Sequence, residues 1–340
     1  MILDLPDFEQ RFPWWGGDLQ TLRDTVMQAL HRLPTDLAPH SSQRQRFDVR
    51  DGSGDVLLGM LDTPVAPQPG TPLVLLIHGA PGNEDGPYML SMSRYMLDRG
   101  HRVLRINLRG AGPSRATCRR QYSAGSSADL GLLFDVMPDE LTRDGMVAVG
   151  YSVGGAVLIK YLGETGKDTP LKAAATVSAP IDLRGTCGQL MRWRNTPYQR
   201  SVLGRMRQEA TAQIAELTAV ERANIEKART ILEYDDGFTA GRNGKANALE
   251  YYAQCSALDY LAGIRIPTLC LAALDDPWVP GSAYVGYDWG GNRWLTPLLV
   301  PNGGHVGFHG TAGLQPWRDL AVAGFFAVSK ASKVRAAGVR

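Results

Sequence analysis

The chain has 340 residues, of which 44% are apolar, so it can bury a core as two domains or as one domain with an insertion. Its 36 lysines and arginines nearly balance its 34 aspartates and glutamates, so the net charge gives no indication of a nucleic acid or an anionic membrane as partner. Its four cysteines are scattered with no CxxC pair, a pattern that indicates neither a zinc site nor a disulfide framework.

The start of the chain, Met1 to Asp7, has no basic region followed by an apolar core, so we expect no secretory signal. No apolar run approaches the ~20 residues that a membrane-spanning helix needs, and we expect no transmembrane segment. The resulting expectation is a cytoplasmic protein with reduced thiols. The sequence leaves the oligomeric state open.

Residues 1–40 are mixed in composition, and we expect them to pack on the core as an N-terminal segment with a short helix over 21–32. Residues 45–49 and 56–61 flank the turn-forming stretch Asp51-Gly52-Ser53-Gly54, which predicts a β-hairpin. Further strands are predicted from apolar runs at 73–77, 103–108, 146–149, 173–177, 268–273 and 296–300.

Helical segments at 89–97, 128–136 and 156–162 alternate with these strands. Apolar runs without alternation are typical of parallel strands that are buried on both faces. The pattern therefore predicts an α/β fold with a mostly parallel central sheet and helices on both of its faces.

The alternation stops between residues 182 and 252, where the chain is polar and charged and has helical stretches such as 209–229. We interpret 182–252 as a helical lid inserted between two parts of the core, 41–181 and 253–328; the alternative is an insertion that only adds bulk. The tail at 329–340 is basic and rich in small residues, and we expect it to be disordered.

The strongest chemical motif is Gly150-Tyr151-Ser152-Val153-Gly154, which matches the nucleophile elbow G-x-S-x-G. In that motif the serine occupies a sharp, strained turn between a strand and a helix, and side chains at the flanking positions would clash. The predicted strand at 146–149 and a helix after Gly154 supply this context. The free N–H groups at the start of the helix point toward the serine, so we predict that Ser152 is a nucleophile.

A serine hydroxyl is a weak nucleophile and needs a base, which follows an acid in the order Ser, acid, His. Of the six histidines, His305 and His309 lie in the loop after the last strand, and the glycines before His305 favour it as the base. The acid should follow the strand at 268–273, where Asp275 and Asp276 compete. The turn that begins at Pro277 favours Asp276, leaving Asp275 as a turn residue.

Two backbone N–H groups are needed for an oxyanion hole. One belongs to Val153, and the other should come from the loop at 78–82. Since Pro81 has no N–H group, Ala80 is the candidate, and His78 is expected to brace the loop. We find no HExxH and no complete Walker A loop, so we expect no metal and no organic cofactor. The tryptophans Trp14, Trp15 and Trp278 are candidates for pocket lining or for core packing.

An ordered set of motifs resembles the YheT/ABHD1-ABHD3 branch of the α/β-hydrolases, the AB-hydrolase-4 group. It spans the chain from about Gly17 to Phe308, and the departures at Asp18, Ala80 and Pro81 lie near the expected pocket. The matching blocks are Gly17 to Leu22 (G-H-L-Q-T in the family), His78 to Gly82, Asn107 to Gly110, Gly150 to Gly155, Lys160 to Glu164, Glu233 to Thr239, Tyr251-Tyr252, Asp275 to Pro277 and Gly303 to Phe308.

This resemblance implies an α/β-hydrolase fold and a triad of Ser152, Asp276 and His305, in agreement with the motifs. It also implies a carboxylic ester hydrolase that acts through an acyl-enzyme on small-molecule acyl esters with short or medium chains. Two alternatives stay open: acyl transfer to an alcohol with the same triad, and a non-catalytic binding protein on a hydrolase scaffold.

Overall fold

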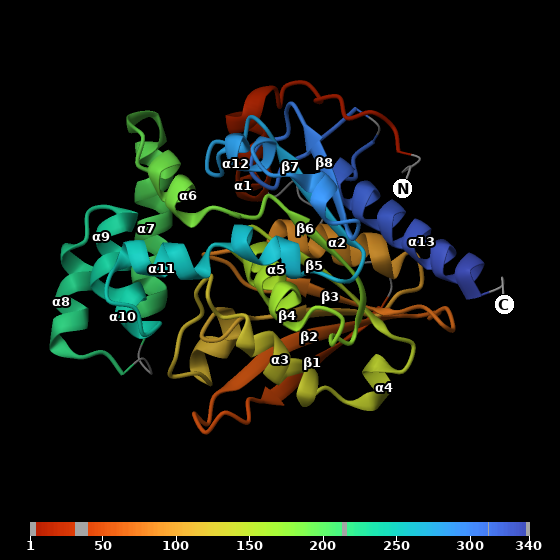
Figure 1. The fold of residues 1–340 in the computed structure, drawn as a ribbon, viewed down its shortest axis with the longest axis horizontal. Helices are drawn as coiled ribbons and strands as arrows, with labels where there is room; N and C mark the ends of the chain where they lie inside the picture. The colour runs from red at the N-terminus through yellow and green to blue at the C-terminus, as the bar shows by residue number, and fades with distance from the viewer. Residues whose placement is uncertain (1–4, 31–39, 213–215, 312, 338–340) are drawn as a thin grey trace.

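The computed structural model describes residues 5–30, 40–212, 216–311 and 313–337. In these ranges eight strands form one sheet in the order β1-β2-β4-β3-β5-β6-β7-β8. The hairpin of β1 and β2 pairs antiparallel with β4, and the other strands run parallel (Figure 1). The strands are β1 (His40–Asp48), β2 (Val56–Pro64), β3 (Leu73–Ile77), β4 (Val103–Ile106), β5 (Met146–Tyr151), β6 (Leu171–Val177), β7 (Thr268–Ala273) and β8 (Leu295–Val300).

The central strands are buried because helices cover both faces of the sheet. In β3, Leu73 and Leu75 face one apolar cluster, whereas Val74 and Leu76 face another, as the two-residue period of a strand requires. The first cluster includes helix α5 (Val153–Thr165), and the second includes α2 (Pro87–Leu97) and α13 (Trp317–Ala337). The predicted mostly parallel sheet with helices on both faces is therefore confirmed.

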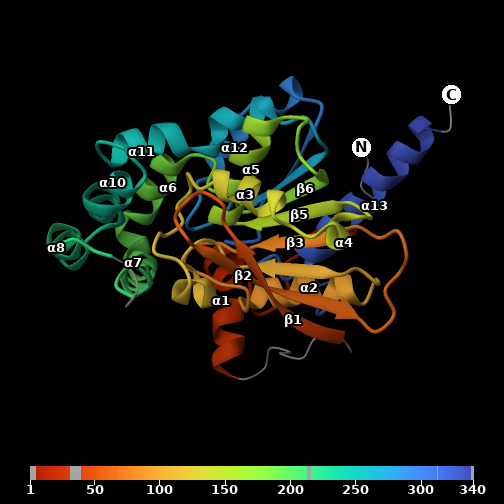
Figure 2. The same ribbon diagram turned by 90° about the horizontal axis from the view of Figure 1, so that it is seen from below.

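The chain between β6 and β7 forms a group of helices that lies beyond one end of the sheet (Figures 1 and 2). This group, which we call the α6–α11 segment, packs around apolar clusters of its own. The prediction of one helix over 209–229 is wrong, because a new helix starts at a Thr218–Glu221 capping box. The helices are α6 (Leu183–Leu190), α7 (Thr196–Ala210), α8 (Ala219–Lys227), α9 (Ile231–Tyr234), α10 (Ala240–Arg242) and α11 (Ala248–Cys255), with a π-helical turn at Asp235–Thr239.

Two ends of the fold differ from expectation. Helix α1 spans Gly16–Ala29 and so starts before the predicted 21–32, of which residues 31 and 32 lie outside the described part. The tail at 329–340, expected to be disordered, is helical as far as Ala337, because α13 continues through it, and residues 338–340 lie outside the described part. Alanine, lysine and arginine are good helix formers, which favours this continuation.

Shorter helices are α3 (Ala128–Asp135), α4 (Asp139–Thr142) and α12 (Gly281–Val285).

The described part of the N-terminal segment packs against the C-terminal part of the chain. Gln10 forms an isolated β-bridge with Gly310, and the ring of Phe8 lies 6.0 Å from that of Phe308. This contact places α1 beside the loop that follows β8. Among the described helices, none combines the length and the apolar character needed to cross a bilayer.

Candidate active site

Ser152 stands alone between the end of β5 and the start of α5, with φ 48° and ψ −124°. This is a conformation that non-glycine residues rarely adopt, and the crowded neighbours hold it in place. A Cβ atom at Gly150 would lie 2.6 Å from the carbonyl oxygen of Gly154, and a Cβ at Gly154 would overlap the carbonyl oxygen of His78. The elbow therefore needs glycine at both positions, as its sequence predicted.

The side chains of Ser152, His305 and Asp276 are joined by hydrogen bonds, although they come from three separate parts of the chain. Ser152 Oγ lies 3.0 Å from His305 Nε2, and His305 Nδ1 lies 2.8 Å from Asp276 Oδ2. Since a carboxylate can only accept, Nδ1 carries the proton and Nε2 is left to accept from the serine hydroxyl. All three residues are buried. The arrangement can remove a proton from Ser152 and stabilise the resulting imidazolium.

The two adjacent aspartates have different partners. Asp276 Oδ1 accepts hydrogen bonds from the backbone N–H groups of Trp278 and Val279, at 2.8 and 3.0 Å, which leaves Oδ2 directed at the imidazole. Asp275 Oδ1 instead accepts from the backbone N–H of Gly304, at 2.9 Å. Burial raises the pKa of the Asp275 carboxyl. Asp276 thus contacts the histidine, and Asp275 ties its loop to the histidine loop.

Helix α1 holds the loop that carries His305. Thr21 Oγ1 accepts a hydrogen bond from the backbone N–H of His305, at 2.8 Å. The amide of Gln20 donates to the carbonyl of His309 at 3.0 Å and accepts from its N–H at 2.7 Å. Gln20 and Thr21 belong to the block Gly17 to Leu22 that resembles the family, but the sequence alone assigns them no role. Only that block could have indicated that these two side chains serve the site.

The loop at 78–82 passes close to the serine. A Cβ atom at Gly79 would lie 2.8 Å from the Cβ of Ser152, so only glycine fits there. The N–H of Gly79 donates to the hydroxyl of Tyr88, whereas Ala80 and Val153 line the cavity beside Ser152. Among the described residues, no hydrogen bond uses the backbone N–H of Ala80 or Val153. These two donors are therefore available to an oxygen atom in the cavity.

His78 braces this loop from within the core. Its Nδ1 lies 2.7 Å from the carbonyl oxygen of Gly79, and its Nε2 accepts from the backbone N–H of Leu108 at 3.0 Å. Both bonds can form together only when the ring is neutral and its proton is on Nδ1. Burial lowers the pKa of His78 to about 4. Protonation would break the bond to Leu108.

We expect the protein to lose stability as the pH falls from 6.5 toward 4, the window between the pKa values of His78 in the unfolded and folded states. In this window the unfolded chain binds a proton that the folded chain rejects, so one such histidine lowers the free energy of unfolding by up to about 1.4 kcal/mol per pH unit. Urea unfolding across this range measures the slope, which should be shallower in His78→Asn. An unchanged slope in that variant would contradict the account.

The other histidines lie elsewhere. His309 is buried next to α1, with Nε2 3.2 Å from Asp24 Oδ1, and is a neighbour of the site rather than its base. His101 Nδ1 lies 2.9 Å from the carbonyl oxygen of Pro72, and His40 begins β1. His31 lies outside the described residues.

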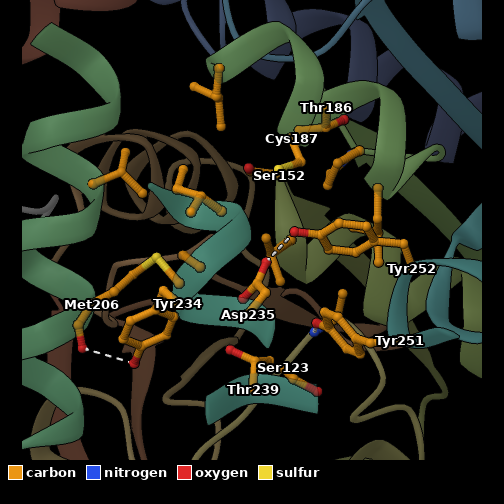
Figure 3. Close-up of a pocket in the computed structure, with 18 of the residues that line it drawn as sticks. Ser123, Ser152, Thr186, Cys187, Met206, Tyr234, Asp235, Thr239, Tyr251 and Tyr252 are labelled. Atoms are coloured by element: carbon orange, nitrogen blue, oxygen red, sulfur yellow. Dashed lines mark hydrogen bonds between the residues drawn. The ribbon is translucent and has the colours of Figure 1, made fainter. Parts of the chain in front are cut away.

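A cavity opens beside Ser152 and extends under the α6–α11 segment, with an empty volume of about 1080 Å³ including its mouth. Its lining is mostly apolar. In Figure 3, Ser152 and Cys187 lie at one end and Ser123 and Thr239 at the other. The lining includes Leu183, Cys187 and Leu190 from α6, Val202 and Met206 from α7, Ile231 and Tyr234 from α9, and Tyr251 and Tyr252 from α11.

Two carboxyl groups lie in the wall of this cavity. Asp235, in the π-helical turn, accepts a hydrogen bond of 2.7 Å from the hydroxyl of Tyr252 (Figure 3), and burial raises its pKa to about 6. Burial likewise raises the pKa of Glu209 to about 7. The thiol of Cys187 has a raised pKa for the same reason, so it is protonated at neutral pH.

A second, more polar groove reaches Ser152 from the side of α1, with an empty volume of about 1850 Å³. Trp278 lines both the cavity and the groove, and its ring stacks on that of His305, with 4.4 Å between centroids and 25° between planes. The ring of Tyr198 in turn meets Trp278 at 5.7 Å. Of the tryptophans considered for a pocket, Trp278 is therefore part of the site, whereas Trp15 is exposed and Trp14 is half-buried.

No group of three or more His, Cys, Asp or Glu side chains in the described ranges is arranged to hold a metal ion. The site that the structure assembles from this part of the chain consists of the serine, histidine and aspartate, two backbone donors, a cavity and a groove.

Comparison with known proteins places this geometry in a family. A model of the alpha/beta hydrolase fold matches residues 72–310. The chain is 30% identical to YheT of Escherichia coli over 299 residues, which is 86% of this chain and 85% of that protein. It is 28% identical to phospholipase ABHD3 of Homo sapiens over 306 residues, covering 86% and 71%. The solved structure of the Pyrococcus furiosus esterase PF2001 shares the fold, with a TM-score of 0.57 at 14% identity, covering 95% of this chain and 98% of that one.

Proposed function

The chain belongs to the alpha/beta hydrolase family, in the group that includes YheT, and from this premise we propose that it is a carboxylic ester hydrolase with Ser152 as nucleophile. One observation carries the proposal: the unbroken line of hydrogen bonds from Ser152 through His305 to Asp276, beside a mostly apolar cavity. A phospholipase among the similar proteins supports ester chemistry.

The reaction follows from the positions of these groups. His305 Nε2 takes the proton of Ser152 as the serine oxygen attacks the ester carbonyl, and Asp276 stabilises the imidazolium. The N–H groups of Ala80 and Val153 stabilise the negative oxygen of the tetrahedral intermediate. His305 then gives its proton to the leaving alcohol, which leaves an acyl group on Ser152. Water repeats the cycle and releases the acid.

The cavity under the α6–α11 segment holds the acyl chain, and the groove beside α1 holds the alcohol. The apolar residues near Ser152 suit a short or medium acyl chain, because the carboxyl of Asp235 and the hydroxyl of Thr239 interrupt the lining further in. Burying either polar group against a long alkyl chain would be costly. The α6–α11 segment then acts as a lid that sets the length of the chain.

Hydrolysis of a p-nitrophenyl ester series from acetate to palmitate tests this function. We expect kcat/KM to be highest for short or medium chains and to fall for palmitate. In the presence of an added alcohol, an excess of transesterified product over free acid would indicate acyl transfer. Failure to turn over any ester, together with failure of a fluorophosphonate to label Ser152, would favour a binding protein on a hydrolase scaffold.

Removal of the hydroxyl that holds the histidine loop should slow turnover. Thr21→Val keeps the shape of the side chain but leaves the N–H of His305 without its acceptor. Because small displacements of a catalytic group are costly, we expect kcat to fall about tenfold to a hundredfold with little change in KM.

The matched control is Thr25→Val, on the same helix and in the same groove. It should leave kcat unchanged, since among the described residues no hydrogen bond joins the Thr25 side chain to the histidine loop. Equal kcat values in the two variants would argue against a positioning role for Thr21.

A further inference from the structure

Helix α1 has the reverse of the usual amphipathic arrangement. Large apolar residues recur along it at spacings of four, three and four and are exposed to solvent: Trp15 by 59%, Leu19 by 44%, Leu22 by 38% and Val26 by 39%. A helix that only covers a core turns such a stripe inward. Figure 2 shows α1 projecting from the body of the protein, which leaves this stripe uncovered by the described elements.

The polar side of α1 faces the protein and is already in use. Gln20 is fully buried and bonded to His309, and Thr21 holds the backbone of His305. Asp24 forms an ion pair with Arg23, and its Oδ1 lies 3.2 Å from Nε2 of the buried His309. The orientation of the helix is therefore fixed by its polar contacts, and the apolar stripe must point away from the core.

Another exposed apolar side chain lies in a turn that is tied to α1. Trp193, in the turn between α6 and α7, is 89% exposed and stands between the exposed residues Arg192 and Arg194. The guanidinium of Arg194 forms an ion pair of 2.7 Å with Asp18 of α1, so the turn is held against the helix. We call Trp15, Leu19, Leu22, Val26 and Trp193 the α1–Trp193 surface.

This surface borders the groove that leads to Ser152. Leu22 and Arg194 line the same groove as Ser152 and His305. A molecule that leaves an apolar environment at the α1–Trp193 surface can thus reach Ser152 along this groove, without passing through the α6–α11 segment.

We propose that the α1–Trp193 surface docks on the interface of a phospholipid membrane that contains anionic lipids. Tryptophan with exposed leucine and valine is typical of side chains that enter the boundary between headgroups and acyl chains. Arg192 is exposed beside Trp193, and among the described residues no carboxylate forms an ion pair with it, so its charge complements a negative leaflet. The net charge of the chain did not reveal this, because Arg192 acts through its local position.

Co-sedimentation with vesicles tests the docking directly. The vesicles are phosphatidylcholine with or without phosphatidylglycerol, and the proteins are the wild type, Trp15→Ala/Trp193→Ala and the control Val65→Ser/Val220→Ser. The control removes exposed valines in the loop after β2 and in α8. We expect the wild type to bind vesicles with phosphatidylglycerol, the tryptophan variant to bind about tenfold more weakly or worse, and the control to bind like the wild type.

A further variant isolates the charge. Arg192→Gln should lower the affinity for vesicles with phosphatidylglycerol by about fivefold and leave binding to pure phosphatidylcholine unchanged. All these variants should hydrolyse a water-soluble short ester at the wild-type rate, since none of the replaced residues contacts Ser152, His305 or Asp276.

Binding does not depend on the proposed function, because Ser152→Ala should bind vesicles as the wild type does even if no ester is turned over. The proposal is overturned if the wild type stays in the supernatant, or if the tryptophan variant binds as well as the wild type. It is equally overturned if sedimentation velocity shows a dimer that the tryptophan variant loses, because the surface would then serve a second copy of the chain.

Discussion

Replacement of Ser152 by alanine is expected to lower kcat on p-nitrophenyl esters by about 10⁴-fold to 10⁶-fold, the range found when the nucleophile of a serine triad is removed. The physical reason is that water must then attack directly, without an acyl-enzyme, while the cavity and the two backbone donors still bind the ester. KM should change little. Steady-state kinetics of Ser152→Ala beside the wild type measure this effect.

A stability control belongs with this experiment, because the strained backbone at Ser152 depends on its neighbours. Alanine fits where serine does, so the Tm of Ser152→Ala should stay close to that of the wild type. Turnover that persists within tenfold of the wild type would mean that another group carries the acyl chain. Cys187 lines the same cavity, but its protonated thiol is a poor nucleophile.

Asp276→Asn should have the second largest effect, a fall in kcat of about 10⁴-fold, because an amide in place of the carboxylate favours the wrong tautomer of the histidine. In the native site Asp276 Oδ2 accepts from His305 Nδ1. An asparagine amide that donates to Nδ1 would leave the ring proton on Nε2. A protonated Nε2 cannot accept the proton of Ser152. The pH profile of kcat records this loss.

Asp275→Asn is the matched control, since it changes the neighbouring residue in the same way. Its Oδ1 accepts from the backbone N–H of Gly304, a role that the amide oxygen of asparagine can also fill. We expect kcat to fall by less than about tenfold. If Asp275→Asn were the more damaging variant, the roles given to the two aspartates would have to be exchanged.

Much of this architecture could be predicted because local sequence determines it. The run at 73–77 is apolar without alternation, and it is a parallel strand with both faces buried. The elbow was predicted from the glycines around Ser152, which the structure shows to be required by close backbone contacts. Local steric rules of this kind act over a few residues and can be read from them.

Other features depend on contacts between distant parts of the chain. The choice between Asp275 and Asp276 depends on which carboxylate reaches the imidazole of His305 and which reaches only the backbone of Gly304, in each case 29 residues along the chain. The bond from His305 to Thr21 spans 284 residues, and the block around Thr21 does not show which part of the chain it contacts. Helix α8 begins at the Thr218–Glu221 capping box. In the sequence, the charged helical composition of 209–229 hides this start.

The α6–α11 segment shows the same limit. Its helical character could be predicted, but the cavity that it encloses requires side chains from several of its helices to meet beside Ser152. The exposed stripe of α1 was also missed. Its spacing predicts a helix but does not determine which side of the helix faces the core.

The formation of an acyl-enzyme on Ser152 is the central claim, and trapping it is the most direct test. The wild-type protein is mixed with a short-chain p-nitrophenyl ester, the reaction is quenched in acid, and the protein is digested. The masses of the peptides are then measured by mass spectrometry. We predict one acyl group, on the peptide that contains Ser152, and none on that peptide from Ser152→Ala. A wild-type protein that turns over the ester but carries no acyl group, or carries it on Cys187, would contradict the mechanism.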